Sequence, residues 1–342
     1  MNILYKYYSE QFDVIEHLLQ PAIKLATTKS LNDPFERNLP NELAYELSDQ
    51  LIKKEKINDN NSSALLSFKD QFREISKAYG VVSLTEENRN ILMWAHYSSS
   101  HKGVSIGYKP TIFEDIKEKQ SKLNGALKGE YLPRKIKYSD KRLEIDRNNE
   151  YGIHDLIMSS MCTKSDHWEY ENEHRCIIPL SWSDMFISPS ETSKELSSTI
   201  YNLLKEGIIC KSTKNKNKTM THYFRSPENQ LKDTEAKINL AENQEIMMMK
   251  NINISHISEI YLGATFCKDK TDSIRNFIES CPEKYGHISV YKYRLNFNQF
   301  LLDLMPVANN KTKFPLSDMI VERNLDPFNL IPKGNILDVT DR

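Results

Sequence analysis

The chain has 342 residues, of which 27% are charged and 39% are hydrophobic, so its composition indicates a soluble globular protein of one large or two ordinary domains. The 46 basic and 47 acidic residues give a formal net charge of −1. This balance argues against a protein dedicated to duplex DNA, which needs a basic surface to neutralise phosphates, but it leaves room for a local basic patch.

The predicted elements alternate irregularly between strand and helix. Apolar periodicity predicts strands at 4–8, 23–27, 80–84, 102–108, 134–138, 169–180, 257–262 and 288–295. It predicts helices at 11–19, 41–79 with a polar break at 58–63, 91–97, 111–122, 148–163 and 270–281. We therefore expect a mixed α+β fold, in which a central mixed sheet is flanked by helices.

The domain organisation follows from where this periodicity is strong. One main domain is expected over residues 1–305, followed by a C-terminal extension over 306–342. Residues 185–250 have the weakest pattern and are interpreted as a peripheral insertion of helix and loop. Within it, the basic stretch Lys211–Lys218 is expected to be a solvated loop.

Scarce glycine limits the ways in which a nucleotide can be bound. The chain has 10 glycines and contains neither G-x-G-x-x-G nor G-x-x-x-x-G-K-[ST], which excludes the usual Rossmann and P-loop phosphate sites. Side chains must therefore hold any bound nucleotide. Five cysteines without a C-x-x-C pair indicate free thiols, and no apolar run suits a signal peptide or a membrane helix. We expect a cytoplasmic protein without membrane contact.

Several polar and aromatic motifs occur in a fixed order. They are Leu4–Tyr7, Leu31–Glu36, Leu92–Tyr97 with His101–Tyr108, Lys164 with Trp168–Arg175, and more weakly Ile260–Gly263. In this order they resemble the uncharacterised DUF2971 family over about residues 3 to 295. Members of that family are found among bacterial mobile and defence-associated genes. The resemblance therefore implies an effector of anti-phage defence or abortive infection, with a partner protein from the same operon.

The motif at 168–175 is the most informative one chemically. In an extended strand Glu169, Glu171, Glu173 and Arg175 share one face, because side chains alternate with a period of two. Three carboxylates in a row repel one another unless they meet a cation, a metal or a substrate. We therefore predict that Glu171, Glu173 and Arg175 are catalytic. The alternative is an exposed strand edge on which Glu173 and Arg175 compensate each other.

The motif at 92–97 offers an aromatic wall and a titratable group. Trp94 and Tyr97 could stack on a ligand, and His96 is predicted to be a catalytic proton shuttle. The alternative is a core aromatic cluster whose histidine is satisfied by a backbone carbonyl. Lys102 begins the predicted strand 102–108 and is a candidate ligand-binding residue.

The loop at 31–36 has two interpretations as well. Asn32, Asp33 and Glu36 could bind a metal or a ribose hydroxyl, or they could form an Asx-Pro turn followed by a helix. No zinc site is expected. Cys162, His167, His174 and Cys176 have suitable side chains, but their spacing is not that of a zinc knuckle.

The first functional hypothesis is an enzyme that uses NAD, because the layout resembles that of ADP-ribosyltransferases in outline. Lys6, between Tyr5 and Tyr7, stands where such folds carry Arg or His; Ser83 lies on a middle strand and Glu171-x-Glu173 on a late one. Breaking the bond between ribose and nicotinamide develops positive charge, which a carboxylate stabilises. The expected ligand-binding residues are Tyr5, Lys6, Tyr7, Asn32, Asp33, Glu36, Ser83, Trp94, Tyr97, Lys102, Lys164 and Trp168.

Two alternatives remain open from the sequence. In a metal-dependent nuclease, Mg²⁺ would be bound by carboxylates and a nucleic-acid phosphate by Lys102 or Lys164. The carboxylates in question are Asp33, Glu36, Glu171 and Glu173. In a non-enzymatic sensor or adaptor, the same residues would form a ligand pocket without turnover. The hypotheses share one requirement, which is that the motif residues converge in one pocket.

Overall fold

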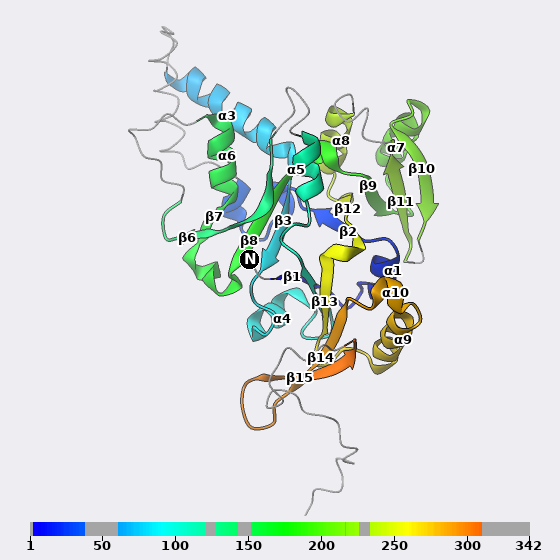
Figure 1. Ribbon diagram of the computed structural model, residues 1–342. Coiled ribbons are helices and arrows are strands. Elements are labelled where there is room, and N and C mark those ends of the chain that lie inside the picture. The colour runs from blue at the N-terminus through cyan, green and yellow to red at the C-terminus, as the bar shows by residue number, and fades with distance from the viewer. Residues whose placement is uncertain are drawn as a thin grey trace, which may run out of the picture.

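The computed structural model describes residues 3–37, 61–120, 128–142, 152–215, 217–225 and 233–309. The fold is mixed α+β with helices around two main sheets, as predicted (Figure 1). No helix among these residues is long and apolar enough to cross a membrane. The first part of the predicted helix 41–79 lies outside the described residues, as does the end of the predicted C-terminal extension.

The larger sheet has eight strands in the order β15-β14-β13-β4-β1-β3-β8-β5. Neighbours are antiparallel except β13 and β14, which are parallel, so the sheet is mixed. The strands are β1 Leu4–Tyr8, β3 Tyr79–Thr85, β4 Val104–Tyr108, β5 Glu130–Lys135, β8 Glu173–Pro179, β13 Ile257–Leu262, β14 Ser289–Leu295 and β15 Leu302–Ala308. The sequence did not predict β15, which continues past residue 305 and ends within the expected C-terminal extension.

The smaller sheet has five antiparallel strands in the order β10-β11-β9-β12-β2. They are β2 Ala22–Leu25, β9 Met185–Pro189, β10 Ile209–Lys214, β11 Thr219–Phe224 and β12 Met247–Asn251. Most of this sheet comes from the segment interpreted as an insertion, and β2 completes it. A short parallel pair, β6 Lys137–Ser139 and β7 Thr163–Ser165, forms a third sheet.

The prediction of a solvated loop over Lys211–Lys218 is wrong for its first half, because Lys211–Lys214 belong to β10, which forms a hairpin with β11. Ser212 and Thr213 pair across the hairpin with His222 and Thr221. The lysines of this stretch whose side chains are described are exposed. A strand that faces solvent on one side carries such a polar pattern, which resembles that of a loop.

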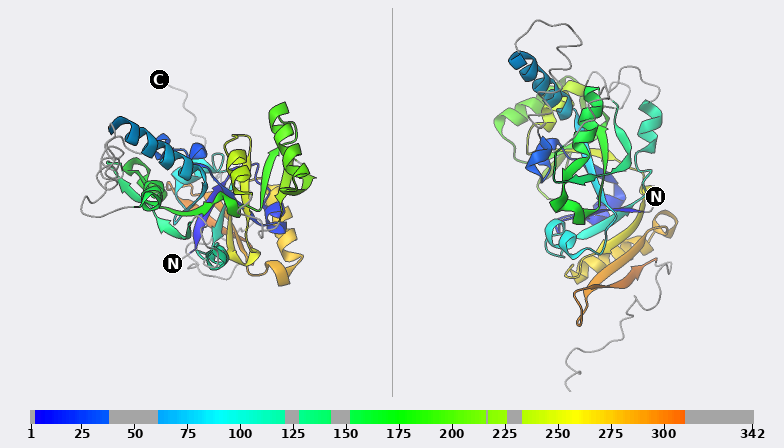
Figure 2. Two further views of the ribbon diagram at one scale, coloured as in Figure 1. Left: turned by 90° about the horizontal axis from the view of Figure 1, so that it is seen from above. Right: turned by 90° about the vertical axis from the view of Figure 1, so that its left-hand side faces the viewer.

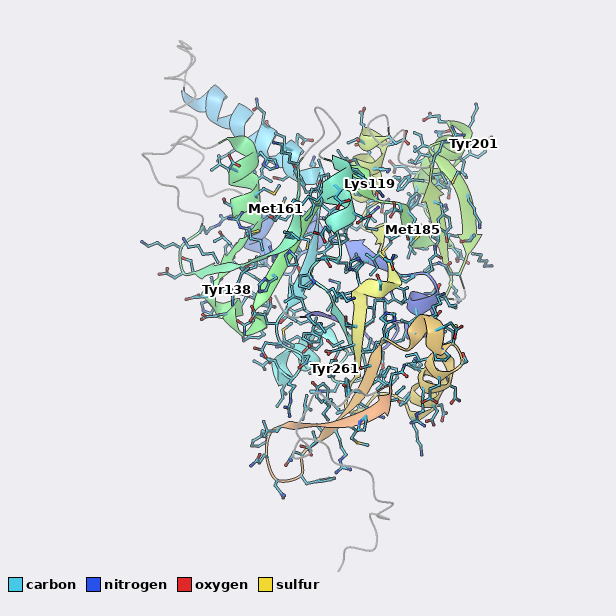
Figure 3. The ribbon with its side chains drawn as sticks, in the orientation of Figure 1. Lys119, Tyr138, Met161, Met185, Tyr201 and Tyr261 are labelled. Atoms are coloured by element: carbon cyan, nitrogen blue, oxygen red, sulfur yellow. The ribbon has the colours of Figure 1, made fainter. Side chains whose placement is uncertain are left out.

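The helices surround these sheets (Figure 1). They are α1 Val14–Leu19, α3 Asn61–Lys77, α4 Ile91–Tyr97, α5 Glu114–Gln120, α6 Ile153–Met161, α7 Lys194–Lys205, α8 Thr234–Ala241, α9 Lys268–Glu279 and α10 Pro282–Tyr285. Short 3-10 turns are η1 Thr28–Ser30, η2 Pro34–Arg37, η3 Asp166–Glu171, η4 Leu180–Trp182 and η6 Ile254–His256. Helices α3 and α7 lie at opposite ends of the molecule (Figure 2), and Tyr138 and Met161 lie at the end away from Tyr201 (Figure 3).

One hydrophobic core joins the two main sheets. Ile106 and Ile260 of the larger sheet and Ile23 and Phe186 of the smaller one are fully buried in the same cluster. A backbone bridge between Ala26 and Val81 ties the end of β2 to β3. The smaller sheet therefore delivers the residues of β2 to the centre of the larger one.

The prediction of a strand from residue 169 is wrong at its start. Residues 166–171 form η3, Asn172 adopts the left-handed region with φ 43°, and β8 begins only at Glu173. Asparagine tolerates this conformation better than most residues do. The turn leaves Glu169 exposed and buries Glu171, so the expected row of three carboxylates does not exist.

Candidate functional site

A central cavity of about 330 Å³ lies where β1, β2, β3 and β8 meet η1, α4 and β7. Its volume is within the range of small-molecule sites. It brings together most of the residues singled out in the sequence, although they are scattered from residue 5 to residue 175. Those lining it are Tyr5, Lys6, Tyr7, Asn32, Ser83, Tyr97, Lys164, Glu171, Glu173 and Arg175.

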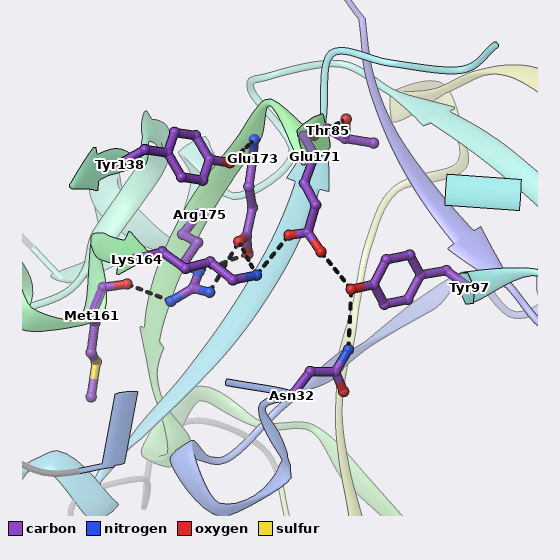
Figure 4. A network of polar contacts seen from close by, with 9 residues as sticks. All are labelled: Asn32, Thr85, Tyr97, Tyr138, Met161, Lys164, Glu171, Glu173 and Arg175. Carbon is purple, nitrogen blue, oxygen red and sulfur yellow. Dashed lines mark hydrogen bonds and ion pairs between the residues drawn. The ribbon is translucent and has the colours of Figure 1, made fainter. Parts of the chain in front are cut away.

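The innermost group is a buried ion pair on strand β8. Arg175 donates from Nε to Oε1 of Glu173 at 2.7 Å and from Nη2 to Oε2 at 3.0 Å (Figure 4). Its Nη1 donates to the carbonyl of Met161 at 2.7 Å. Residues two apart on a strand share a face, so β8 itself presents both groups to the cavity. This forked geometry holds the carboxylate in one orientation.

The charge state of Glu173 follows from these contacts. Burial alone would raise its pKa. The charges of Arg175 and Lys164, with hydrogen bonds from Arg175 and Ser83, outweigh burial and lower the pKa to about 2. Glu173 is therefore ionised at neutral pH, and its oxygens are occupied by partners from β3, β7 and β8.

Glu171 is held differently and keeps more of its capacity to accept hydrogen bonds. Lys164 donates to its Oε2 at 2.6 Å, and the Tyr97 hydroxyl donates to its Oε1 at 2.5 Å. Asn32 in turn donates to the Tyr97 oxygen at 3.3 Å. Thr85 fixes the backbone by donating to the carbonyl of Glu171. An ionised carboxylate accepts about four hydrogen bonds, so Glu171 can accept further bonds from a ligand.

Lys164 connects the two carboxylates. Its Nζ lies 2.6 Å from Glu171 and 3.2 Å from Glu173, and the side chain is buried. Burial would lower the pKa of Lys164, but Glu173 and Glu171 overcome that effect and raise it. The ring of Trp168 lies 4.5 Å from Nζ, so this predicted residue contacts Lys164 but does not line the cavity.

Two further lysines line the cavity without a matching carboxylate. Lys6 donates to the carbonyl of Ser83 at 3.1 Å. Burial, and then the charge of Lys24, lower the pKa of Lys6 to about 8, although Glu173 opposes this. Burial also lowers the pKa of Lys24. Neither lysine forms an ion pair with any residue that the structure describes. Two positive charges without a paired carboxylate therefore line the cavity.

The net charge of the central cavity is therefore positive. Lys6, Lys24, Lys164 and Arg175 outnumber the two carboxylates among the lining residues. Sequence reasoning missed Lys24. Its signal is a lone lysine within the apolar strand β2, a position that needs a partner or a ligand to be favourable.

Besides Trp168 and Asp33, three predicted site residues do not line the central cavity. Trp94 is fully buried, packs edge to face against Tyr7 with 5.1 Å between ring centroids, and donates to a backbone carbonyl, so the core interpretation holds for it. His96 is exposed on α4 and does not line the cavity, which corrects its assignment as a proton shuttle there. Lys102 is also exposed and lies 4.0 Å from Glu10.

The 31–36 loop forms the structural turn that was the alternative to a metal site. Asp33 is buried, and its Oδ1 accepts from the backbone N of Phe35 at 2.9 Å. It lines a neighbouring cavity and not the central one. The backbone of Glu36 is part of η2, while its side chain lies outside the described residues. Within the described ranges no three His, Cys, Asp or Glu side chains are grouped to hold a metal ion.

Comparison with protein families gives one match that covers much of this site. Residues 93–176 match the model of a family described as protein of unknown function (DUF2971). The matched segment runs from α4 to β8 and includes Tyr97, Lys164, Glu171, Glu173 and Arg175. Neither the curated proteins nor the solved structures provide a match to the chain.

Proposed function

Residues 93–176 match the DUF2971 family model, and on that premise we propose that the central cavity is an NAD-using active site of the ADP-ribosyltransferase type. One observation carries the proposal. Lys6 on β1, Ser83 on β3 and Glu173 on β8 lie on three successive strands of the larger sheet and line one cavity with Glu171. The outline of such enzymes places polar site residues on a first, a middle and a late strand, although Lys6 stands here in place of the usual Arg or His.

Different lining residues of the cavity suit the pyrophosphate, the nicotinamide and the ribose of NAD⁺. Lys6 and Lys24 supply positive charge for a pyrophosphate, which no glycine-rich loop could hold in this chain. Tyr5, Tyr7 and Tyr97 line the cavity and are the candidates to contact a base or nicotinamide. Glu171 can accept a hydrogen bond from a ribose hydroxyl.

The reaction would proceed by heterolysis of the bond between ribose C1′ and the nicotinamide nitrogen. The electron pair leaves with nicotinamide and cancels its positive charge, while positive charge develops on the ribose. The carboxylate of Glu171 stabilises that charge. Water or an acceptor hydroxyl then bonds to C1′ and releases its proton to solvent. Glu173 acts through its neighbours, because it holds Arg175 and Lys164 in place and is therefore a positioning residue.

The experiment is incubation of the purified protein with NAD⁺ and measurement of free nicotinamide. Glu171→Gln keeps the shape of the side chain but removes its charge, and turnover should fall by about 10²-fold or more. Glu279→Gln, an exposed position at the end of α9, is the matched control and should leave turnover unchanged. Wild-type protein that neither binds NAD⁺ saturably nor releases nicotinamide would overturn the proposal.

A ligand sensor without turnover is the second candidate. The observation that favours it is the close pairing of Lys164 with both carboxylates, which is also how a buried structural network is built. Saturable NAD⁺ binding without nicotinamide release identifies this case. The nuclease hypothesis has less support, because Asp33 is held in its turn, and Glu171 and Glu173 are paired with cations. A role in anti-phage defence stays a prediction, tested by phage plating on cells with wild-type or Glu171→Gln protein.

A further inference from the structure

Two smaller cavities lie beside β6 and β7, and the second of the three adjoins the central one. The second cavity, of about 210 Å³, shares Lys164 with the central cavity and is also lined by Asp33 and Phe35. The third cavity, of about 220 Å³, shares Arg142 and Thr163 with the second. The three cavities therefore form a series that leads from Glu171 outward to the strands β5 and β6.

The third cavity is strongly basic. Five of its lining residues are Arg134, Lys135, Lys137, Lys141 and Arg142, and the described lining residues include no aspartate or glutamate. Hydroxyl groups of Ser139 and Ser159 also line this cavity, whereas the Thr163 hydroxyl donates to the carbonyl of Ser159. In a chain with a net charge of −1, such a concentration of positive charge in a hollow of the surface favours a polyanionic ligand.

Asp33 and Asp140 line the second cavity beside Lys141 and Arg142, and two other cations of the third cavity have carboxylates close by. Glu130 lies 4.0 Å from Arg134, and Glu86 lies 3.3 Å from Lys135; all four side chains are well exposed. Exposed pairs of this kind are weak and yield to a ligand. Lys137 is exposed and makes no ion pair with the residues that the structure describes.

Aromatic side chains accompany the cations. The ring of Phe35 in the second cavity is 63% exposed, and the guanidinium of Arg142 lies 5.8 Å from its centroid. Trp168 is partly exposed and its ring contacts Lys164, which lines both the second and the central cavity, although Trp168 itself lines neither. Cationic grooves with aromatic platforms are the usual means of binding single-stranded nucleic acids, because phosphates meet the cations and bases stack on the rings.

We infer that the second and third cavities bind a single-stranded nucleic acid whose chain leads into the central cavity as the acceptor substrate. This inference rests on the proposed function for the acceptor step. An oxygen or nitrogen of the nucleic acid bonds to ribose C1′ as nicotinamide leaves with the C–N electron pair, and the acceptor's proton passes to solvent. A single strand can place phosphates in the third cavity and a base against Phe35, whereas a duplex keeps its bases stacked inside.

The test uses the full chain and fluorescently labelled 12-nucleotide RNA and DNA strands, with binding followed by anisotropy over a series of KCl concentrations. Arg134→Ala/Lys137→Ala removes two exposed cations of the third cavity, and thermal melting checks that the variant is folded. Affinity at low salt should fall at least about tenfold. The slope of log affinity against log salt should become shallower by about 1.4, because each phosphate contact on a single strand contributes ~0.7.

The matched control is Lys211→Ala/Lys214→Ala, which removes two exposed lysines from β10, and it should bind as the wild type does. Absence of saturable binding to both strands, or equal loss in both double variants, would overturn the inference. The RNA and DNA arms identify which sugar is preferred. If nicotinamide is released but neither RNA nor DNA binds, this inference is overturned and the proposed function stands. Strand binding through the third cavity without nicotinamide release supports the binding site and removes the proposed function.

Discussion

The ammonium group of Lys164 lies 2.6 Å from a carboxylate oxygen of Glu171, with both side chains about 5% exposed. The two residues are seven positions apart, and the 3-10 turn η3 between them folds the chain back so that they meet. A second carboxylate, from Glu173, lies 3.2 Å from the same ammonium group. The charge balance of the central cavity therefore depends on one lysine.

Removing Lys164 should destabilise the protein strongly. Lys164→Met keeps much of the side-chain volume but leaves two buried carboxylates with fewer partners, and breaking a buried pair in this way costs ~3–5 kcal/mol. Urea denaturation measures the free energy of unfolding. Lys250→Met, which removes a lysine 2.8 Å from Asp184 in a more exposed pair, should cost less. Equal losses in the two variants would contradict the central role of Lys164.

Acid should lower the free energy of unfolding because Glu173 becomes protonated. The pKa of this carboxyl is lowered from 4.5 to about 2 in the folded state, so its stabilising contribution is present above pH 4.5 and is lost as the pH falls through about 2. Between pH 6 and 3 the loss from this group is about 2 kcal/mol, by one-site linkage. Glu173→Gln lacks the contribution at every pH, so the difference in stability between wild type and variant should narrow in acid. A constant difference from pH 6 to 3 would show that the group is not ionised by its neighbours.

Anion binding in the central cavity should weaken in alkali through Lys6. Its pKa is lowered to about 8, so the lysine loses its charge as the pH rises through that value, below the usual range for lysine. Affinity for NAD⁺ or inorganic pyrophosphate should fall by about tenfold per pH unit at most above pH 8. Isothermal titration from pH 7 to 9.5 measures this. Lys6→Arg stays charged and should remove the dependence, while a dependence that persists in Lys6→Arg would assign it to another group.

The same pKa predicts a gain in stability with pH. For a lysine whose folded pKa lies below the unfolded value, the charged form is disfavoured in the folded state. Stability should therefore rise as the pH increases from about 8 to 10.5. Urea midpoints measured across this range should increase for the wild type more than for Lys6→Met. A wild-type urea midpoint that stays constant over this pH range would contradict the lowered pKa of Lys6.

Truncation of Trp94 and truncation of His96, both on α4, should have different effects on the free energy of unfolding. Trp94 is fully buried among aromatic rings, so Trp94→Ala should lower the free energy of unfolding by ~3–5 kcal/mol. His96 is exposed, so His96→Ala should change it by no more than ~0.5 kcal/mol. Thermal denaturation of both variants provides the comparison. A loss of nicotinamide release in His96→Ala without loss of stability would restore the catalytic role first assigned to it.

Local patterns predicted local elements well. Asn90 accepts hydrogen bonds from the first turn of α4, and the predicted bounds of that helix agree with the observed Ile91–Tyr97. Strand β1 also has its predicted bounds. In both segments the apolar spacing and the flanking residues point to the same element, so no tertiary contact had to be known.

The sequence correctly predicted that Glu171 and Glu173 meet in one cavity. The predicted reason, a continuous strand from residue 169, was wrong. Glu171 and Glu173 meet at Lys164 because Asn172 turns the chain, and not because they share a strand face. Short-range patterns do not reveal such a turn. Lys24 was missed because its place at the cavity depends on the packing of the smaller sheet against the larger one.

The bridge between Ala26 and Val81 has a mechanical consequence for the cavity. Lys24 belongs to the smaller sheet, whereas Lys6, Glu173 and Arg175 belong to the larger one. A ligand that contacts both Lys24 and the Glu173–Arg175 pair of β8 would cross-link the two sheets in addition to this bridge. Ligand binding in the central cavity should therefore slow the exchange of the backbone amide hydrogens of Ala26 and Val81. The degree of slowing would measure how strongly the ligand stabilises the contact between the two sheets.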